Sequence, residues 1–439
     1  MPEVLVTALT RRGLVAPFAI QSRTLPDALA GRDILGRAQT GSGKTLGFGL
    51  PMLARLADTV GSRGERAPRG LVLVPTRELA RQVADVLAPL GHSVGVRLTT
   101  VYGGASMGKQ IDALRRGVDL VVATPGRLID LMERGAVRLD RVVISVLDEA
   151  DHMADLGFLP AVTQILDETS QGSQRMLFSA TLDRGVDKLV TRYLNDPAIH
   201  AVASANAPVE LADHRVFVMP ASDKVAIAAE MAGRPGRSLF FVRTKHGADR
   251  LAQQLSRAGA PAAAIHGNLN QNQRQRALAG FTAGHPRVLV ATDVAARGIH
   301  VDDVDLVVHF DPPNDSKDYL HRSGRTARAG ASGTVVALVE PGQVRLMANM
   351  HSEAGVTPVS HRVASGHEAV VEIANSGEPV PPPPPVAVRQ STSAGSGRPS
   401  SSRGGYPSRG RRPSYGSGRG ATASGSPSGP RRTATRAAS

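Results

Sequence analysis

The chain has 439 residues, enough for two ordinary domains and a remainder. It contains no cysteine, which excludes a disulfide framework, a thiolate metal site and a cysteine nucleophile. The formal net charge of +14 favours a polyanionic partner. The sequence opens without a secretory leader pattern, and no run approaches the roughly 18 apolar residues of a membrane span. We therefore expect a cytoplasmic protein.

Short apolar runs rich in Val, Ile and Leu alternate with segments of helical length. This pattern is typical of a buried parallel sheet covered by helices on both faces, an α/β fold. In chain order the predicted strands are 33–38, 70–76, 118–125, 141–149 and 174–181, then 237–244, 262–267, 287–293, 304–310 and 333–340. The same succession of elements occurs twice, so we predict two α/β domains.

Between the two halves lies VASANAPVELADHR, 202–215, which is small and polar and which we interpret as a linker. The predicted boundaries are 1–203 for the first domain, 204–212 for the linker, 213–365 for the second domain and 366–439 for a disordered tail. The tail is basic, because residues 379–439 hold ten Arg, no Lys and no acid and so leave +4 for the rest of the chain. Its Pro, Gly, Ser and Arg composition cannot offset the entropy of ordering.

A glycine-rich turn, AQTGSGKT, follows the first predicted strand and precedes a helix-capable segment. This context is typical of a phosphate-binding loop, although Ala38 stands where the first glycine is usual. Gly41 and Gly43 would let backbone N–H groups approach phosphate oxygens. Lys44 would neutralise the β and γ phosphates, and Thr45 would place a hydroxyl on magnesium.

Three carboxylates, Asp148, Glu149 and Asp151, follow the buried strand of residues 141–149. Carboxyl ends of parallel strands face the ligand crevice of such sheets. Alone, the cluster could equally be a solvated turn. Beside a phosphate loop, Asp148 is suited to holding magnesium and Glu149 to orienting or deprotonating a water. The two motifs together predict one nucleotide hydrolysis site.

The second half contains YLHRSGRTARAG, 319–330, in which Arg322, Arg325 and Arg328 are three residues apart and share one face if the segment is helical. By itself this is a basic solvated helix. The alternative is that two of the arginines act as arginine fingers on the nucleotide of the first domain.

Taken in order, these blocks resemble the DEAD-box ATP-dependent RNA helicases over roughly residues 5–345. The matching blocks are PFAIQ, AQTGSGKT, PTRELA, YGG, TPGR, DEAD, SAT, FFVRTK, QNQR, ATDVAARGIH and HRSGRTARAG. The resemblance implies two tandem RecA-like domains that close on ATP, magnesium and RNA.

The resemblance also implies a role for each matching residue. Those implied to contact ATP are Gln21, Thr40, Gly41, Ser42, Gly43, Lys44, Thr45 and Asp293. Catalysis is assigned to Lys44, Asp148, Glu149, Arg325 and Arg328, magnesium binding to Thr45 and Asp148, and the coupling of hydrolysis to strand separation to Ser179, Thr181 and Asp151. The residues implied to line the RNA backbone path are Pro75, Thr76, Arg77, Gly103, Gly104, Thr124, Pro125, Gly126, Arg127, Gln271, Arg274 and Thr292.

Three positions depart from the family pattern. Counting back to the aromatic residue usual well upstream of Gln21 passes Met1, so that residue is absent or the start of the sequence is misplaced. His300 replaces the acidic residue thought to touch the ribose, and His152 stands where an Arg is common.

Three functions remain open at this stage. They are an RNA helicase or remodeller, an ATP-gated RNA clamp that scaffolds proteins without unwinding, and a DNA-directed helicase, against which Gln21 argues. The basic tail is interpreted either as a nonspecific RNA tether or as a solvated linker.

Overall fold

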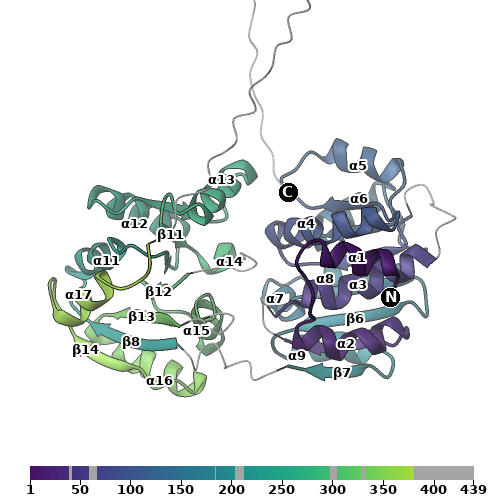
Figure 1. Cartoon of the computed structure of the whole chain (residues 1–439). Helices are drawn as coiled ribbons and strands as arrows, with labels where there is room; N and C mark the ends of the chain where they lie inside the picture. Colours follow the sequence, from purple (N-terminus) through teal and green to yellow (C-terminus); the bar gives the residue numbers. More distant parts are fainter. Residues whose placement is uncertain are drawn as a thin grey trace, which may run out of the picture. The chain divides into compact units, whose positions relative to one another are not determined.

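The computed structural model of the chain describes residues 1–38, 42–58, 67–182, 184–202, 212–296, 304–327 and 332–379 (Figure 1). The chain divides into two compact units, Met1–Pro384 and Pro385–Ser439, and all of the described residues belong to the first. They form two parallel sheets of seven strands, each flanked by helices. We call the described residues up to 202 the first lobe and residues 212–379 the second lobe. The α/β prediction with tandem RecA-like domains is confirmed.

The first lobe is built on one sheet with the strand order β3-β4-β2-β5-β6-β1-β7, all of whose pairings are parallel. The strands are β1 Ile34–Arg37, β2 Gly70–Leu73, β3 Leu98–Val101, β4 Leu120–Ala123, β5 Ile144–Asp148, β6 Gln174–Ser179 and β7 Ala198–Ala201. The helices are α1 Glu3–Thr10, α2 Ala19–Leu29, α3 Lys44–Asp58, α4 Arg77–Ser93, α5 Met107–Arg115, α6 Pro125–Glu133, α7 Ala150–Asp155, α8 Leu159–Asp167 and α9 Arg184–Tyr193.

Both faces of this sheet are buried, which explains its continuous apolar strands. Alternate side chains of β2 point to opposite faces, so that Val72 joins the core under α1 to α4, whereas Leu71 and Leu73 join the core under α5 to α9. The close packing leaves no room for a side chain at Gly36 of β1, where a Cβ would meet the ring of Phe178.

The second lobe repeats this plan with the strand order β10-β11-β9-β12-β13-β8-β14. Its strands are β8 Ala212–Val218, β9 Ser238–Phe241, β10 Ala262–Ile265, β11 Val288–Ala291, β12 Leu306–His309, β13 Gly333–Val339 and β14 Val359–Arg362. Its helices are α11 Lys224–Ala232, α12 Lys245–Arg257, α13 Gln271–Thr282, α14 Asp293–Ala296, α15 Ser316–Ser323, α16 Val344–Ala354 and α17 Glu368–Ala374, with a 3₁₀ turn at Pro341–Gln343. The outermost pair joins β8 in parallel to β14, with Arg215 opposite Val359.

All ten predicted strands are present, but β3, β7, β8 and β14 were not predicted, and β8 begins inside the segment interpreted as a linker. The interpretation of the whole segment 202–215 as a linker is therefore wrong for residues 212–215, whereas the predicted domain start at residue 213 lies one residue after the start of β8. Asp213, His214 and Arg215 make that stretch look polar, yet His214 is buried and bonds the hydroxyl of Tyr319. Residues 203–211 lie outside the described residues.

The predicted disorder from residue 366 is also wrong at its beginning, because α17 is an ordered helix that buries Ala369, Val370 and Ile373. Two charged contacts fasten it to the lobe. The Arg215 guanidinium donates to both oxygens of Glu372 in the helix, at 2.6 and 2.8 Å, and Arg234 donates to the carbonyl of Ser376, two residues after the helix ends, at 3.2 Å. The rest of the predicted tail, residues 380–439, lies outside the described residues.

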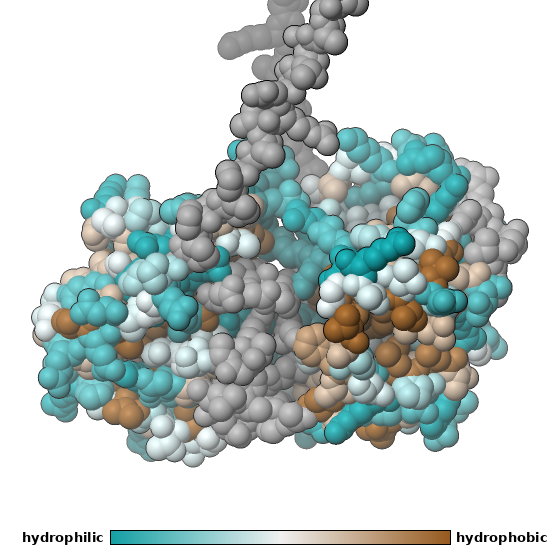
Figure 2. Space-filling model, viewed as in Figure 1, coloured by the Kyte–Doolittle hydropathy of each residue, from teal (hydrophilic) through white to brown (hydrophobic). Residues whose placement is uncertain are grey.

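Figure 2 shows a surface that is mostly hydrophilic, with hydrophobic residues gathered on the first lobe where Figure 1 places its N-terminal helices. Val4 and Val6 of α1 are exposed there, while Leu5 and Leu9 of the same helix are buried. Within the described ranges, no helix has both the length and the apolar character that a membrane crossing requires.

Candidate functional site

Most of the predicted site residues of the first lobe lie at one edge of its sheet. Because every strand is parallel, all carboxyl ends meet at this edge, which we call the strand-end rim. The motif GKT follows β1, DEAD overlaps the end of β5 and SAT the end of β6, and these three strands are neighbours. The residues predicted to contact RNA follow β3, β4 and β2, which are neighbours on the other half of the sheet.

The phosphate-loop lysine and the first DEAD carboxylate form the centre of the rim. Lys44 begins α3, and its Nζ lies 3.8 Å from Asp148 Oδ1; both side chains are buried. Burial raises the pKa of Asp148 to about 6, against the opposing effect of the Lys44 charge. Asp148 Oδ1 accepts no hydrogen bond within the described part of the chain, so it is available to a cation. Ser42 and Thr45, close to Lys44 in the sequence, are half-buried, whereas Thr40 and Gly41 lie outside the described residues.

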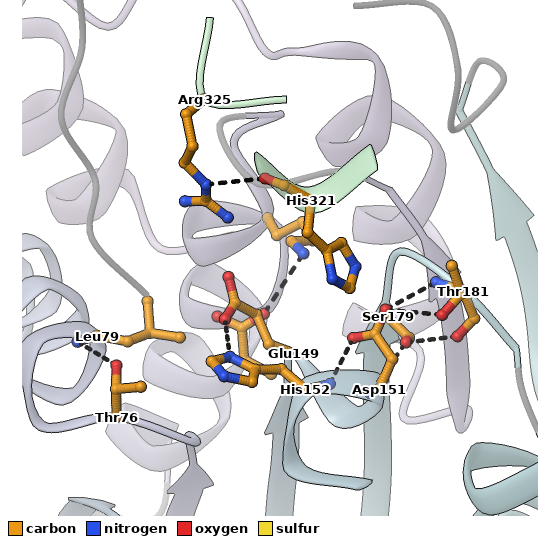
Figure 3. Close-up of polar contacts among 11 residues, drawn as sticks. Thr76, Leu79, Glu149, Asp151, His152, Ser179, Thr181, His321 and Arg325 are labelled. Carbon is orange, nitrogen blue, oxygen red and sulfur yellow. Dashed lines mark hydrogen bonds and ion pairs between the residues drawn. The ribbon is translucent and has the colours of Figure 1, made fainter. Parts of the chain in front are cut away.

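Glu149 adopts a left-handed backbone conformation with φ 55° and ψ 52° where β5 turns into α7. Residues other than glycine avoid this region, and such strain clusters at functional sites. The Glu149 carboxylate lies 3.2 Å from Nδ1 of His152, one helical turn later (Figure 3). Burial opposes ionisation of Glu149, but the hydrogen bond and charge of His152, with the charges of Lys44 and Arg325, hold its pKa well below its usual range.

Asp151 connects the DEAD and SAT motifs directly. Its Oδ2 accepts hydrogen bonds from the Thr181 backbone N–H at 2.9 Å and from the Thr181 hydroxyl at 3.0 Å (Figure 3). The Ser179 hydroxyl donates to the Thr181 carbonyl at 2.6 Å and accepts from the Asp151 N–H at 3.3 Å. A shift of either motif therefore moves the other.

Gln21 bridges the N-terminal segment and the phosphate loop. Its Nε2 donates to the Gly43 carbonyl at 2.9 Å, and its Oε1 accepts the Phe18 N–H at 3.0 Å. Gly43 has a φ of 85°, and a Cβ there would meet both Gln21 and Phe18, so this position requires glycine. The predicted adenine-contacting residue is thus held at the loop.

Two of the first-lobe segments predicted to bind RNA are in contact with each other. The Arg77 guanidinium lies against the backbone of Gly103 and Gly104, where a Cβ on Gly104 would overlap it. Thr76 caps α4, as its hydroxyl accepts the Leu79 N–H at 3.2 Å.

The third segment predicted to bind RNA begins α6. There Thr124 and Pro125 are buried, Gly126 is exposed with open space around it, and Arg127 donates to the Ala105 carbonyl at 3.3 Å. Pro75, the remaining first-lobe residue predicted to bind RNA, is buried.

The RNA-binding residues predicted for the second lobe already have protein partners. Arg274 Nε donates to Glu78 Oε1 at 2.8 Å, and Gln271 Nε2 donates to the same oxygen at 3.2 Å. Thr292 is buried, and its N–H bonds the Ile265 carbonyl. Glu78 belongs to PTRELA and was not predicted as a site residue. Its place as a carboxylate inside that motif was the available signal.

Arg322 and Arg325 do not share one face of a helix, in contrast to the arrangement expected if the whole segment 319–330 were helical. Helix α15 ends at Ser323, and Gly324 follows it, so Arg325 lies beyond the helix. Arg322 is buried and donates to both oxygens of Asp293, at 2.6 and 2.9 Å. Arg325 is half-buried, its Nε donates to the His321 carbonyl at 3.3 Å, and its charge contributes to the low pKa of Glu149 (Figure 3). Arg328 and His300 lie outside the described residues.

Comparison with known proteins agrees with this arrangement. The sequence model of the family described as DEAD/DEAH box helicase matches residues 18–189, and that of the helicase conserved C-terminal domain matches residues 223–330. The chain belongs to the DEAD-box helicase family. Its two lobes correspond to the two domains by which these helicases are recognised.

Curated DEAD-box helicases resemble the chain over most of its length. DEAD-box ATP-dependent RNA helicase 30 of Arabidopsis thaliana is 42% identical over 338 residues, covering 76% of this chain and 57% of that protein. ATP-dependent RNA helicase DBP2 of Scheffersomyces stipitis is 41% identical over 352 residues, covering 79% of this chain and 66% of that protein. The chain thus spans about half to two thirds of the length of such relatives.

Among solved structures, S. cerevisiae Dbp5 bound to RNA and ADP BeF3 superposes with a TM-score of 0.74. The two chains are 27% identical, and the match covers 85% of this chain and 98% of that one.

Proposed function

We propose that this chain is an RNA-dependent ATPase that separates short RNA duplexes or remodels RNA–protein complexes. One observation carries the proposal. The Lys44–Asp148 pair, the strained Glu149 and the Asp151–Thr181 connection meet at one rim of a parallel sheet. The residues suited to phosphate chemistry therefore lie beside the Asp151–Thr181 hydrogen bond, which could couple hydrolysis to movement of the SAT motif. Relatives named as ATP-dependent RNA helicases, and the fold shared with a protein bound to RNA and ADP BeF3, support it.

In this proposal ATP lies at the β1 end of the rim. Lys44 and the backbone N–H groups of the loop at Thr40, Gly41, Ser42 and Gly43 hold the phosphates. Gln21 reads the adenine while it remains bonded to Gly43. Asp293 contributes from the second lobe through the segment that Arg322 anchors.

Magnesium fits the residues at this site. Asp148 Oδ1 is buried without a hydrogen-bond partner among the described residues, and burial raises its pKa although the Lys44 charge opposes this shift. Magnesium is usually held by one or two carboxylates together with phosphates and water. Asp148 and Thr45 would hold it, and it would neutralise phosphate charge.

Glu149 orients or deprotonates the attacking water. Its low pKa keeps the carboxylate ionised near neutral pH, as a base requires. Arg325, whose charge already acts on Glu149, stabilises the transferring phosphate as an arginine finger together with Arg328.

The RNA backbone follows the β2, β4 and β3 half of the rim. Its contacts are those listed for the first lobe in the sequence prediction, joined by Gln271, Arg274 and Thr292 from the second lobe. Aromatic residues make up only 3% of the chain, so backbone contacts outweigh base stacking, and binding is sequence-tolerant. Opening costs about 1.4 kcal/mol per base step, by analogy with DNA, so one cycle melts only short duplexes.

Strand displacement is the experiment that tests the proposal. Release of a short RNA duplex is measured with ATP, with a nonhydrolysable analogue and without nucleotide, and ATP turnover is compared with RNA and with DNA of the same sequence. We expect displacement with ATP and faster turnover with RNA, since the 2′-hydroxyl distinguishes the two. ATP turnover without displacement would favour the clamp, and equal stimulation by DNA would favour a DNA-directed enzyme.

The cellular location stays a prediction. We propose the cytoplasm, the compartment expected in the sequence analysis, although curated relatives include proteins named as mitochondrial and chloroplastic. Fractionation with an antibody to the tail tests this point.

A further inference from the structure

We propose that His152 is a positioning residue, which holds the Glu149 carboxylate in the orientation needed to activate water. This inference rests on the function proposed above and deepens it. The sequence singled out His152 only as a departure from the family pattern, where an Arg is common. In the structure, the histidine at this position makes a hydrogen bond with the Glu149 carboxylate.

The two side chains meet at the start of α7. Glu149 directly precedes this helix and His152 lies in its first turn, with His152 Nδ1 3.2 Å from Glu149 Oε2 (Figure 3). The His152 side chain is 6% exposed and the Glu149 side chain 9%, so water competes little for this bond. A carboxylate only accepts hydrogen bonds, so the bonding proton belongs to Nδ1 of the imidazole.

The other nitrogen of the ring strengthens the assignment. His152 Nε2 is buried without a hydrogen-bond partner among the described residues. A histidine kept in the core for packing or for a hydrogen-bond network would be expected to satisfy both nitrogens. This ring instead makes one side-chain bond, and that bond goes to the predicted base.

The backbone explains why Glu149 needs support. A left-handed residue at the strand end is strained, and its own side chain does not cap α7. The backbone that follows Glu149 is fixed, because the His152 N–H donates to Asp151 Oδ1 at 3.0 Å and Asp151 is bonded to Thr181. The backbone of His152 is therefore held in place, and the hydrogen bond from its ring restricts the orientation of the Glu149 carboxylate.

The bond leaves the chemistry of Glu149 intact. A carboxylate has two oxygens with about four lone-pair sites, so one donor on Oε2 still leaves capacity to accept a proton from water. Orientation matters because a displacement of about 1 Å at a reacting group can lower a rate roughly 100-fold. His152 thus acts through Glu149 and needs no contact with ATP.

The test compares His152→Phe, which removes the donor and keeps a ring, with His152→Asn, whose amide nitrogen can stand at the position of Nδ1. We expect His152→Phe to lower kcat for RNA-stimulated ATP hydrolysis by roughly 10-fold to 100-fold, with KM for ATP and the affinity for RNA unchanged. His152→Asn should recover most of the lost kcat. A structural role alone would not produce this split or this rescue.

A double-mutant comparison shows whether the effect passes through Glu149. In a Glu149→Gln background, adding His152→Phe should cause no further loss of kcat, because the group it positions is already gone. The matched control is His200→Phe, which removes another histidine–carboxylate pair of the first lobe, to Asp27 at 2.9 Å, and should leave kcat unchanged. If His152→Phe does not fold, the adaptable His152→Met replaces it.

Three results would overturn the inference. They are a kcat for His152→Phe within two-fold of the parent chain, a loss of equal size in both backgrounds, and no rescue by His152→Asn. The proposed function fails differently, since the parent chain itself would then show no RNA-stimulated hydrolysis.

Discussion

Arg322 and Asp293 form a two-pronged ion pair inside the second lobe, with nitrogen–oxygen distances of 2.6 and 2.9 Å. The Arg322 side chain is 2% exposed, and its guanidinium also donates to the Asp311 carbonyl and lies over the Phe241 ring. Arg322 thereby ties α15, which precedes Arg325, to the end of β11, which precedes Asp293. Its role is to hold two parts of the predicted site at fixed positions.

Replacing Arg322 with Met should destabilise the second lobe by about 3–5 kcal/mol, because it leaves the Asp293 carboxylate without its partner. Urea unfolding monitored by circular dichroism measures the change. The control is Arg138→Ala in the first lobe, whose ion pair with Asp140 is exposed and should not affect unfolding. Equal stability of the parent and Arg322→Met chains would show that the pair does not anchor α15.

Replacing Lys44 with Ala should abolish ATP turnover while the fold is retained. The phosphates lose their nearest buried cation, and Asp148 loses the charge that partly offsets its burial. Steady-state ATPase assays measure turnover, and thermal unfolding verifies the fold. Substantial turnover by a folded Lys44→Ala chain would place the phosphates elsewhere.

Replacing Glu149 with Gln should slow hydrolysis by roughly 100-fold or more while ATP and RNA still bind, because the base is lost but the shape is kept. RNA should then dissociate slowly in the presence of ATP, since the closed state persists. Filter binding and single-turnover hydrolysis separate the two effects. If the variant turns over ATP like the parent chain, the base is another group.

Replacing Thr181 with Val should uncouple hydrolysis from strand displacement. The change removes the hydroxyl that donates to Asp151 Oδ2 at 3.0 Å, while the backbone bond from residue 181 at 2.9 Å remains. We expect ATP turnover within a few-fold of the parent chain and a larger loss of displacement per ATP hydrolysed. A proportional loss of both activities would contradict the coupling role of this connection.

The second lobe should lose stability as the pH falls from about 6.5 to 4. Burial lowers the pKa of His351 to about 4 and that of His309 well below its usual range, and both rings lie against Tyr319. Folding favours their neutral forms, so this stabilisation is complete above the unfolded pKa near 6.5 and disappears as the pH falls through the folded values.

Unfolding by urea at pH 7, 5.5 and 4.5 checks this expectation. His351→Phe keeps the edge-to-face ring contact and should reduce the pH dependence by an amount on the order of 2–3 kcal/mol. Comparing the variant with the parent chain cancels the carboxylates that titrate in the same range. If the free energy of unfolding changed with pH equally in the two chains, His351 would not be a cause of the pH dependence.

The sequence predicted the parts of the structure that repeat a simple pattern. The central strands were found because both of their faces are buried, which makes them continuous apolar runs such as Leu120–Ala123. Edge strands escaped prediction for the opposite reason. Ile199 of β7 and Val359 of β14 are largely exposed. Strand β7 is only four residues long, Ala-Ile-His-Ala, and β14, Val-Ser-His-Arg, holds a single apolar residue.

At the site, the motifs predicted which residues gather, but not their partners. Asp148 and Lys44 were placed together correctly because strand order brings their loops to one rim. The bonds from Glu78 to Arg274, and from Glu149 to His152, depend on side-chain geometry that no spacing in the sequence encodes. Arg322 was assigned to a helical face, and its burial depends on Asp293, which lies 29 positions away.

The Arg215–Glu372 bond brings together the first strand and the last helix of the second lobe. The chain therefore enters and leaves this domain at neighbouring points, as β8 and β14 also pair side by side. Such proximity is the usual condition for circular permutation and for inserting one domain into another. New ends could be opened in a surface loop after a short peptide joins the old ones, with the sheet order unchanged.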